Sequence, residues 1–267
     1  MKVNGKVVVV TGAGNGMGRE LTLELVQRGA KVAAVDMRAE ALTETQTLAA
    51  KLGGTVECFT VDITDAQSVA ALPELISQKL GAVDALINNA GIIQPFVKVI
   101  DLELAAAARV MAVNFTGPLM MVKAFLPGLL TRPVAHILNV SSMGAYAPVP
   151  GQSVYGASKA AVMLFTEGLF SELMGTNVGV TVVFPGAIAT NIAGNSGIDM
   201  PADASADAPK FKMTLPTVAA AKMVDAIEAN KPRVTIGSDA TMLDRITRIN
   251  PIYAAKMIAK QMGSLLK

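Results

Sequence analysis

The sequence predicts an α/β fold in which a mostly parallel, seven-stranded sheet is doubly wound, with helices on both faces. Two patterns predict it. Seven short apolar runs rich in β-branched residues alternate with helical patterns, and the first run enters a glycine-rich turn that opens a helix. The chain of 267 residues, 52% of them apolar, can bury one sizeable core. We therefore expect a single domain over residues 1–267, with an irregular segment at about 187–214 and a helical tail at about 239–267.

The elements follow from local patterns. Continuous apolar runs indicate buried parallel strands, which we expect at 6–10, 31–35, 55–61, 83–87, 134–140, 178–184 and 233–236. Helical patterns separate these strands, at 19–29, 39–53, 101–130, 156–173 and 217–229. Thr64 or Asp65 is expected to cap a further helix before the fourth strand.

Composition argues against several classes of protein. The net charge is only +2, so nothing indicates a nucleic-acid partner. The single cysteine, Cys58, is expected to be a buried strand residue; it rules out an internal disulfide framework and fits a reducing compartment, so we expect a cytoplasmic protein. No signal peptide is visible, and the apolar segment 117–130 is too short to span a bilayer. No metal site is expected around the only histidine, His136, which we interpret as a structural strand residue rather than a general base.

A glycine pattern follows the first strand, at Thr11 to Gly18. Its spacing is T-G-x-x-x-G-x-G, carried by Gly12, Gly16 and Gly18. Between a strand and a helix, such glycines let the backbone approach a pyrophosphate, and the helix N-terminus supplies amide donors. A tight connection alone would need the same residues, but the context favours dinucleotide binding.

The end of the second strand carries Asp36, eighteen residues beyond Gly18. A carboxylate at this distance can accept a hydrogen bond from the adenosine ribose and would repel a 2′-phosphate. Asp36 therefore favours NAD over NADP, and Arg38 is the possible exception. The alternative role for Asp36 is a strand-end cap to the following helix, at 39–53.

Two later strand ends carry polar residues. Asp62 and Ile63 follow the third strand, where Asp62 could meet the adenine edge or only cap a helix. Asn88, Asn89, Ala90 and Gly91 follow the fourth strand. Asparagine side chains can hold an irregular strand end, and the small pair lets a cofactor lie close, although a plain turn would look the same.

A possible catalytic set lies in the second half of the chain. Tyr155 and Lys159 share one helix face because they are four residues apart, and a nearby ammonium lowers the pKa of a phenol. Ser142 follows the fifth strand and can donate to a substrate oxygen. Asn114 is a poor residue for the interior of a helix, so we expect either buried structural hydrogen bonds or a catalytic one.

These motifs, in this order, resemble the short-chain dehydrogenase/reductase family, in its short single-domain branch with a Rossmann fold. The resemblance covers residues 5 to about 237. It rests on the glycine pattern, N-N-A-G at 88–91, Asn114, Ser142, Y-x-x-x-K at 155–159, and P-G at 185–186 followed by Thr190.

The resemblance implies the cofactor contacts. Gly12, Gly16 and Gly18 would bracket the pyrophosphate, Asp36 would bind the adenosine ribose, and Asp62 would lie near the adenine. Ile188 would contact the carboxamide through its backbone. The remaining implied cofactor residues are Thr11, Asn15, Met17, Met37, Ile63, Asn89, Ala90, Gly91, Tyr155, Lys159, Pro185, Gly186 and Thr190.

The resemblance also implies the catalytic roles. Tyr155 would be the general acid/base, and Lys159 would lower its pKa and bind the nicotinamide ribose. Ser142 would orient and polarise the substrate oxygen, and Asn114 would hold a water in a proton relay to Lys159.

The substrate and the partners are less constrained. The irregular segment 187–214 is expected to act as a substrate loop. The residues expected around the substrate are mostly apolar, with Gln152 and Tyr146 as the polar contacts, and predict an apolar secondary alcohol or ketone: Ile92, Ile93, Gln94, Pro95, Phe96, Met143, Ala145, Tyr146, Val149 and Gln152.

The family implies a homodimer or homotetramer formed through helices at about 101–130 and 153–173. The competing functions are an NADP(H)-dependent ketone reductase, a dehydratase or epimerase, and a non-enzymatic dinucleotide sensor.

The tail has two helical stripes. The first consists of Met242, Leu243, Ile246 and Ile249, and the second, after Pro251, of Ala254, Ile258, Met262 and Leu265. Lys256, Lys260 and Lys267 lie opposite the second stripe. A basic amphipathic helix can lie on a membrane surface, but packing on its own domain or on a partner subunit is the favoured interpretation.

Overall fold

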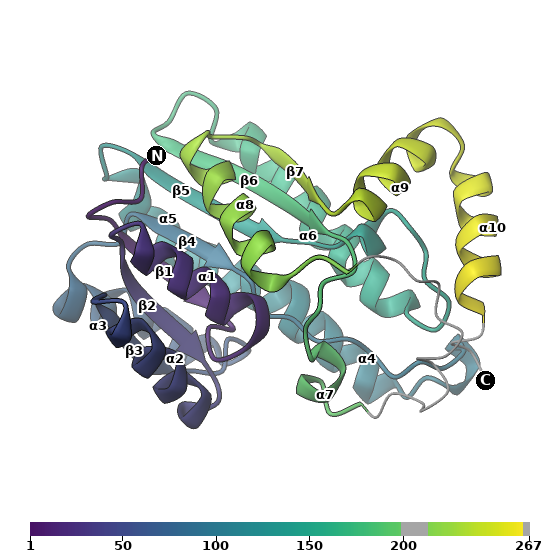
Figure 1. Ribbon diagram of the computed structural model, residues 1–267, viewed down its shortest axis with the longest axis horizontal. Helices are drawn as coiled ribbons and strands as arrows, with labels where there is room; N and C mark the ends of the chain where they lie inside the picture. The colour runs from purple at the N-terminus through teal and green to yellow at the C-terminus, as the bar shows by residue number, and fades with distance from the viewer. Residues whose placement is uncertain (199–212, 264–267) are drawn as a thin grey trace.

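The structure, a computed structural model, describes residues 1–198 and 213–263 (Figure 1). The strands are β1 (Val7–Thr11), β2 (Lys31–Asp36), β3 (Val56–Thr60), β4 (Ala85–Asn88), β5 (Ala135–Val140), β6 (Val178–Pro185) and β7 (Arg233–Ile236). The helices are α1 (Gly16–Gln27), α2 (Ala39–Lys51), α3 (Ala66–Leu80), α4 (Leu104–Met111), α5 (Gly117–Leu130), α6 (Ser153–Glu172), α7 (Ile192–Asn195), α8 (Pro216–Glu228), α9 (Ser238–Ile249) and α10 (Pro251–Met262). Short helical turns are η1 (Val99–Asp101), η2 (Ala112–Thr116) and η3 (Met143–Ala145).

The seven strands form one sheet in the order β3-β2-β1-β4-β5-β6-β7. Every pairing is parallel, as the continuous apolar runs predict. The strand order reverses between β1 and β4, so the connections that leave these two strands diverge to opposite faces of the sheet. A crevice at the carboxyl ends of the strands results, which is the usual place for a ligand in this class of fold.

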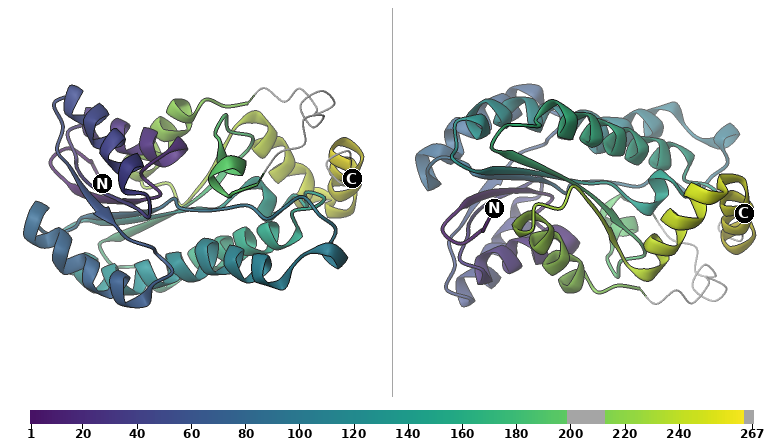
Figure 2. Two further views of the ribbon diagram at one scale, coloured as in Figure 1. Left: turned by 90° about the horizontal axis from the view of Figure 1, so that it is seen from below. Right: turned by 90° about the horizontal axis from the view of Figure 1, so that it is seen from above.

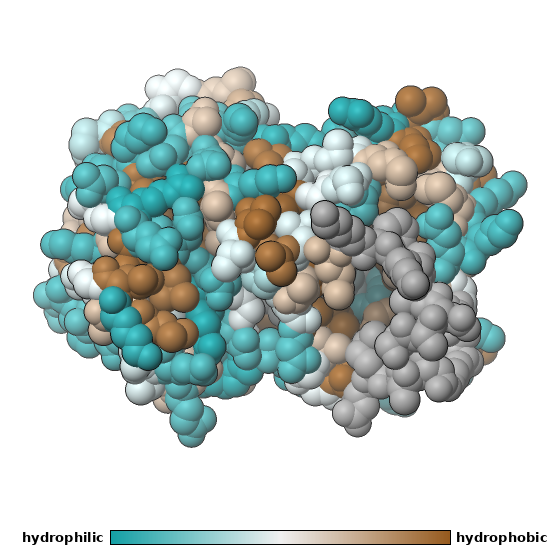
Figure 3. All heavy atoms as spheres, viewed as in Figure 1, coloured by the Kyte–Doolittle hydropathy of each residue, from teal (hydrophilic) through white to brown (hydrophobic). Residues whose placement is uncertain are grey.

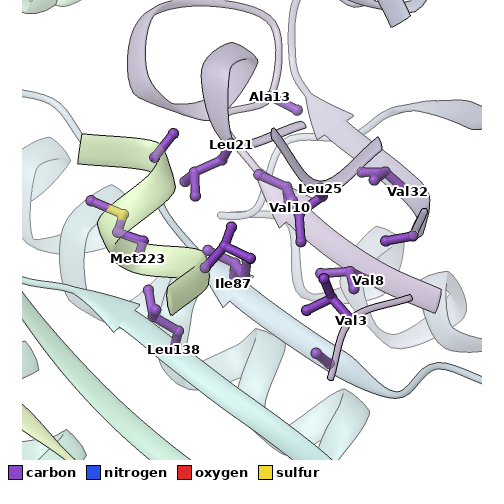
Figure 4. Packing of buried hydrophobic residues seen from close by; sticks show 14 of the residues in the cluster. Val3, Val8, Val10, Ala13, Leu21, Leu25, Val32, Ile87, Leu138 and Met223 are labelled. Carbon is purple, nitrogen blue, oxygen red and sulfur yellow. The ribbon is translucent and has the colours of Figure 1, made fainter. Parts of the chain in front are cut away.

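Helices cover both faces of the sheet (Figure 2). One core cluster joins the sheet to α1, α2 and α8, and a second joins it to α3, α5 and α6. Strand β1 shows why, because Val8 and Val10 belong to the first cluster and Val7 and Val9 to the second. Successive side chains of a strand point to opposite faces, so a continuous valine run packs against both layers. Figure 4 shows the first cluster, in which residues such as Leu21 and Met223 meet the strands.

The long helix expected at 101–130 begins later, at Leu104, and contains a π-helical turn at Ala112–Thr116. Through this turn α4 and α5 form one helical stretch of 27 residues, which by length and composition alone could cross a membrane. The apolar segment 117–130 is α5 alone, 14 residues long, and it reaches this length only together with α4 and the turn between them. Only 39% of its most apolar window is buried, and the buried side of α5 packs on α3, β4 and β5.

The C-terminal tail packs on its own domain, as the favoured interpretation expected. Ala254 and Ile258 of α10 are buried, and Ile258 packs with Ala147 and Leu243. The stripe expected on α9 is only partly right: Leu243 is buried, whereas Ile249 is 85% exposed. Figure 3 shows apolar atoms at the corner where α9 turns into α10. Leu265, Lys267 and residues 199–212 of the expected substrate loop lie outside the described residues.

Two single residues test the strand predictions. His136 is 1% exposed within β5, and its Nε2 lies 2.8 Å from the Thr181 hydroxyl. Burial lowers the pKa of His136 to about 3, which confirms a neutral structural residue. Cys58 lies in β3 as expected but is half-buried rather than buried, and its thiol donates to the Leu42 carbonyl.

Candidate cofactor and active site

The glycine turn forms one wall of a cleft at the carboxyl ends of β1 and β4. Gly12 has a φ of +67°, which favours glycine, and a Cβ on Gly18 would overlap the Gly12 carbonyl oxygen. The side chain of Asn15 accepts from the Gly16 amide at 2.6 Å and caps α1. No acidic side chain occupies the first turn of α1, so this helix N-terminus is free to attract an anion.

Asp36 connects the glycine turn to the end of β2. Its carboxylate accepts from the Gly14 amide and from the Arg38 amide, each at 3.0 Å, and the residue is 8% exposed. The Arg38 Nε lies 3.5 Å from an Asp36 carboxylate oxygen. Asp36 thus holds the strand end against the glycine turn and lines the cleft, but it is not the N-cap of α2, which is Arg38.

The segment after β4 is pinned to the end of β1. The Thr11 hydroxyl accepts from the amides of Asn89 and Ala90 at 3.0 and 3.1 Å. The Asn89 side chain donates to the Thr11 carbonyl at 3.0 Å. Within the described part of the chain, the buried side-chain oxygens of Asn88 and Asn89 have no hydrogen-bond partner. The predicted irregular strand end is therefore real, and two acceptors remain for a ligand or water.

The cleft has a volume of about 330 Å³. It joins a helix N-terminus suited to phosphates, a carboxylate suited to a ribose hydroxyl, and a glycine-lined floor, so its residues fit a dinucleotide. The predicted cofactor residues that line it are Gly12, Asn15, Gly16, Met17, Gly18, Asp36, Met37, Asp62, Ile63, Asn89, Ala90, Gly91 and Thr190. The predicted residues outside its lining are Thr11, Tyr155, Lys159, Pro185, Gly186 and Ile188.

Several residues of the cleft have no counterpart in the sequence prediction. Arg109, Ala112 and Val113 line it from the α4–η2 stretch. The sequence feature that could have indicated Arg109 is that it is the only charged residue of α4, LAAAARVM. The Asn195 side-chain oxygen of α7 accepts from Arg38 at 3.1 Å and from Asn15 at 3.4 Å, a contact between distant segments that no local pattern could indicate.

A second unforeseen residue fixes the turn after β6. The carboxylate of Asp239 in α9 is 6% exposed and accepts from the Ala187 amide at 2.7 Å. A Cβ on Gly186 would overlap this carboxylate. The glycine of the P-G motif therefore leaves space for the Asp239 carboxylate. The Gly186 amide donates to the Ile236 carbonyl at 2.8 Å.

Ser142 and Tyr155 meet over Gly144. Ser142 follows strand β5, and its hydroxyl accepts a hydrogen bond from the Gly144 amide at 3.0 Å. Tyr155 lies in the first turn of α6. A Cβ on Gly144 would lie 3.3 Å from Tyr155 Cε1 and 3.4 Å from the Ser142 hydroxyl. Burial raises the pKa of Tyr155, and the neighbouring Ser142 hydroxyl opposes this by lowering it. The expected net lowering of the Tyr155 pKa is therefore not found.

Lys159 and Asn114 meet over Gly91. A Cβ on Gly91 would lie 3.0 Å from Lys159 Nζ and 3.3 Å from the Asn114 side-chain oxygen. Lys159 is 4% exposed and donates to the Val140 carbonyl at 3.0 Å. Burial lowers the pKa of Lys159 to about 8. The four predicted catalytic residues therefore gather around two glycines at the same edge of the sheet.

Asn114 lies in the π-helical turn and makes three side-chain hydrogen bonds. Its side-chain oxygen accepts from the Ile92 amide, and its side-chain nitrogen donates to the Ile92 carbonyl and to the Ser158 hydroxyl, all at 2.9 Å. The residue is fully buried. The structural hydrogen bonds expected of a mid-helix asparagine are thus present, and the water relay stays a prediction.

The polar residues expected to face the substrate are used inside the protein. The Gln94 side chain is fully buried against α6. Gln152 donates to the Gln94 carbonyl at 2.7 Å, and its side-chain oxygen has no partner among the described residues. The Tyr146 hydroxyl donates to the Ala240 carbonyl at 2.9 Å. Of the two predicted polar contacts, Tyr146 uses its hydroxyl within the fold, and Gln152 is buried with only its side-chain oxygen unused; Gln94 is too deeply buried to line the pocket.

Comparisons with known proteins agree with this geometry. A model of the family described as short chain dehydrogenase matches residues 6–200. SadH of Mycobacterium tuberculosis, an oxidoreductase by name, is 36% identical over 96% of this chain and 94% of its own. A short-chain dehydrogenase/reductase from Burkholderia phymatum, solved with NAD, has a TM-score of 0.84 at 25% identity and covers 96% of this chain and 97% of its own. A short chain dehydrogenase from Burkholderia cenocepacia, solved with NADP, has a TM-score of 0.80 at 29% identity and covers 97% and 99%.

Proposed function

The chain belongs to the short-chain dehydrogenase/reductase family, and on that premise we propose that it interconverts a secondary alcohol and a ketone with NAD(H) as the cofactor. The observation that carries the proposal is the pairing of Tyr155 with Ser142 beside a dinucleotide cleft. The two side chains meet over Gly144, where a Cβ would lie 3.3 Å from Tyr155 Cε1 and 3.4 Å from the Ser142 hydroxyl. A non-enzymatic sensor would not need this pair.

The proposed mechanism divides the work between the two hydroxyl groups. In the oxidative direction Tyr155, as the phenolate, takes the proton of the alcohol, while Ser142 donates to the same oxygen. The NAD⁺ that the cleft residues would hold would supply the acceptor for the hydride of the carbinol carbon. In the reverse direction Tyr155 returns the proton to the carbonyl oxygen.

Lys159 and Asn114, which meet over Gly91, support this chemistry. The Lys159 ammonium is buried with one carbonyl partner, that of Val140, and has further donors to offer a ribose hydroxyl or a water. Because burial lowers the pKa of Lys159 to about 8, its charge is lost above that pH. We infer that Lys159 assists Tyr155 only while it is protonated, so oxidation in alkali gains phenolate but loses the ammonium.

Asp36 supports NAD as the preferred cofactor. Its carboxylate lines the cleft, and two backbone amides hold it in place, so a 2′-phosphate would meet a fixed negative charge. Arg38 lies beside it and favours the opposite preference, and the Burkholderia cenocepacia neighbour was solved with NADP. We place NAD first because the Arg38 side chain is 42% exposed and already contacts Asn195.

The substrate side supports an apolar ligand. The polar atoms of Gln94 and Tyr146 are used within the protein, so few remain to meet a polar substrate. Met143 and Tyr146, close to Ser142 in the chain, and Met257 and Met262 of α10 all pack against one small apolar cluster. Methionine side chains adapt to irregular apolar shapes, which suits an apolar alcohol or ketone.

Assembly into a homo-oligomer is part of the same proposal. Leu164 and Phe170 of α6 are 69% and 42% exposed, and Leu104 of α4 is 85% exposed. Large exposed apolar residues on adjacent helices favour a second copy of the chain as the partner. Size-exclusion chromatography with light scattering tests this assembly.

The test of the proposed activity is a panel of secondary alcohols, steroids and hydroxyacyl compounds. Each is incubated with the purified protein and NAD⁺, with NADP⁺ in parallel, and formation of the reduced cofactor is followed by absorbance. Turnover with NAD⁺ of an apolar secondary alcohol supports the proposal. A preference for NADP⁺ would show that Arg38 outweighs Asp36. Tight NADH binding without turnover of any compound, or of the matching ketones in reverse, would favour the sensor.

A further inference from the structure

A three-residue segment after β4 binds three separate parts of the molecule. Ile92 exchanges two backbone hydrogen bonds with the Asn114 side chain. The Ile93 amide donates to the Ser196 hydroxyl, which follows α7, at 3.0 Å. Gln94 reaches the N-terminus of α6, the helix that carries Tyr155 and Lys159. The segment therefore lies between the cofactor cleft and the catalytic helix.

Gln94 has the contacts of a helix cap that is supplied from outside the helix. Its side-chain oxygen accepts from the amides of Val154 at 2.7 Å and Tyr155 at 3.0 Å. Its side-chain nitrogen donates to the Gly151 carbonyl at 2.9 Å. The first amides of a helix have no partner within it, and α6 has no side-chain hydrogen bond from its own N-cap residue, Gln152.

The contact between residues 92–94 and the start of α6 is reciprocal, and both glutamine side chains are buried from solvent. Gln152 donates to the Gln94 carbonyl at 2.7 Å, so each glutamine binds the backbone at or beside the other. Gln94 is 0% exposed and Gln152 is 4% exposed. Buried hydrogen bonds are costly to break because water cannot replace the lost partner, so this pairing fixes the start of α6 against β4.

Both backbone polar groups of Tyr155 are linked by hydrogen bonds to residues 92–94. Its amide donates to Gln94, and its carbonyl accepts from the Ser158 hydroxyl at 2.7 Å. Ser158 in turn accepts from Asn114, which binds Ile92. The position of the Tyr155 phenol relative to Ser142 therefore depends on residues 92–94, which also adjoin the cofactor-lining residues Asn89 to Gly91.

We propose that Gln94 is a positioning residue for the reaction: it caps α6 from β4 and fixes Tyr155 at the distance and angle that proton transfer to the substrate needs. The inference rests on the proposed oxidoreductase activity. A displacement of a reacting group by about 1 Å costs on the order of 100-fold in rate, so loss of the cap should act on turnover rather than on cofactor binding.

The test compares three variants with the wild-type protein. Gln94→Met keeps the length of the side chain and removes the hydrogen bonds. Gln94→Glu keeps an oxygen acceptor at the positive end of the helix, where a carboxylate is also favoured. Gln46→Met is the matched control, because the Gln46 side chain donates to the Val56 carbonyl at 2.7 Å between α2 and β3, away from the catalytic residues.

The expected result is a split between kcat and cofactor affinity. Gln94→Met should lower kcat by roughly 10- to 100-fold with the NADH Kd changed by less than about threefold, and Gln94→Glu, which keeps the acceptor but loses the donor to the Gly151 carbonyl, should recover part of the loss. Gln46→Met should lower the melting temperature slightly and leave kcat unchanged. An unchanged kcat in Gln94→Met, or an equal loss in Gln46→Met, would overturn the proposal.

Amide hydrogen exchange supplies a readout that does not need a substrate. With NADH bound, Gln94→Met should speed exchange in the peptide that contains Val154 and Tyr155, and Gln94→Glu should restore protection. Unchanged protection would refute the cap. If the cap is confirmed but the wild-type protein turns over no compound, the proposed activity fails and the catalytic role of Gln94 fails with it, while a failed cap beside normal turnover refutes Gln94 alone.

Discussion

The turns after β1 and β4 lie side by side at the same edge of the sheet, yet they are built in opposite ways. The β1 turn depends on missing side chains: Gly12 adopts a positive φ, and Gly18 leaves room for the Gly12 carbonyl. The β4 segment depends on side chains that reach far along the sequence. Its hydrogen bonds join Ile92 to Asn114, Ile93 to Ser196 and Gln94 to Tyr155, across 22, 103 and 61 residues.

This difference separates binding from chemistry. The β1 turn presents backbone to a ligand, so an added side chain should damage it. The β4 segment orients the catalytic helix, so a removed side chain should damage it. Changes at the first should therefore appear in cofactor affinity, and changes around the second in turnover.

Tyr155→Phe should have the largest effect on turnover. Loss of the hydroxyl removes the general acid/base, which should lower kcat by about 10²–10⁴-fold, whereas NADH affinity should stay close to the wild-type value. Steady-state kinetics and NADH fluorescence titration measure the two quantities. Tyr253→Phe is the control, because Tyr253 is 58% exposed on α10 and should change neither. Equal losses in both quantities would show that the two turns are not separable in function.

Gly18→Ala should damage the β1 turn. The added Cβ overlaps the Gly12 carbonyl and the Asn89 side chain, which should cost about 1–3 kcal/mol and weaken NADH binding by about tenfold or more. The control is Gly128→Ala, on an open surface of α5 where a Cβ meets nothing within 4 Å. Calorimetric titration with NADH gives the affinity, and normal binding by Gly18→Ala would refute the assigned role of the turn.

Asp36→Asn should change cofactor choice with a smaller effect on activity. The amide keeps the shape and removes the charge that repels a 2′-phosphate. A hydrogen bond to a charged group contributes about 1.5–3 kcal/mol, so the NAD/NADP ratio of kcat/KM should fall by about tenfold or more. Glu40→Gln, an exposed neighbour in the first turn of α2, should leave the ratio unchanged. An unaltered ratio in Asp36→Asn would mean that Arg38 or another group sets the preference.

His136→Gln should have no effect on turnover near neutral pH, because His136 is buried within β5 and far in the chain from either turn. Burial lowers the pKa of His136 from 6.5 to about 3, so the unfolded chain binds a proton that the folded protein does not. The free energy of unfolding should therefore fall as the pH drops from about 6.5 towards 3, by at most about 1.4 kcal/mol per pH unit from this residue. Urea unfolding at several pH values measures the slope, and His136→Gln should reduce it by that amount.

The sequence by itself determined the alternation of strands and helices and the cofactor side of the site. A valine run that packs on both faces indicates a parallel strand, and glycines spaced between a strand and a helix indicate a phosphate turn, because both features depend on residues close in the chain. The catalytic tetrad also came from short motifs, through the family resemblance. The π-helical turn at Asn114 was not predicted; the Asn114 side chain there bonds to Ile92 and Ser158, which are distant in the chain.

Only the tertiary structure decided how the polar residues on the substrate side are used. Gln94 and Tyr146 read as pocket residues in the sequence, but the fold turns their polar atoms inward to α6 and α9. Asp239 and Asn195 carry no motif, yet they fix the turn after β6 and bridge Arg38 to Asn15. Such contacts join residues far apart in the chain, and a buried polar atom takes whichever partner the fold brings within hydrogen-bonding distance.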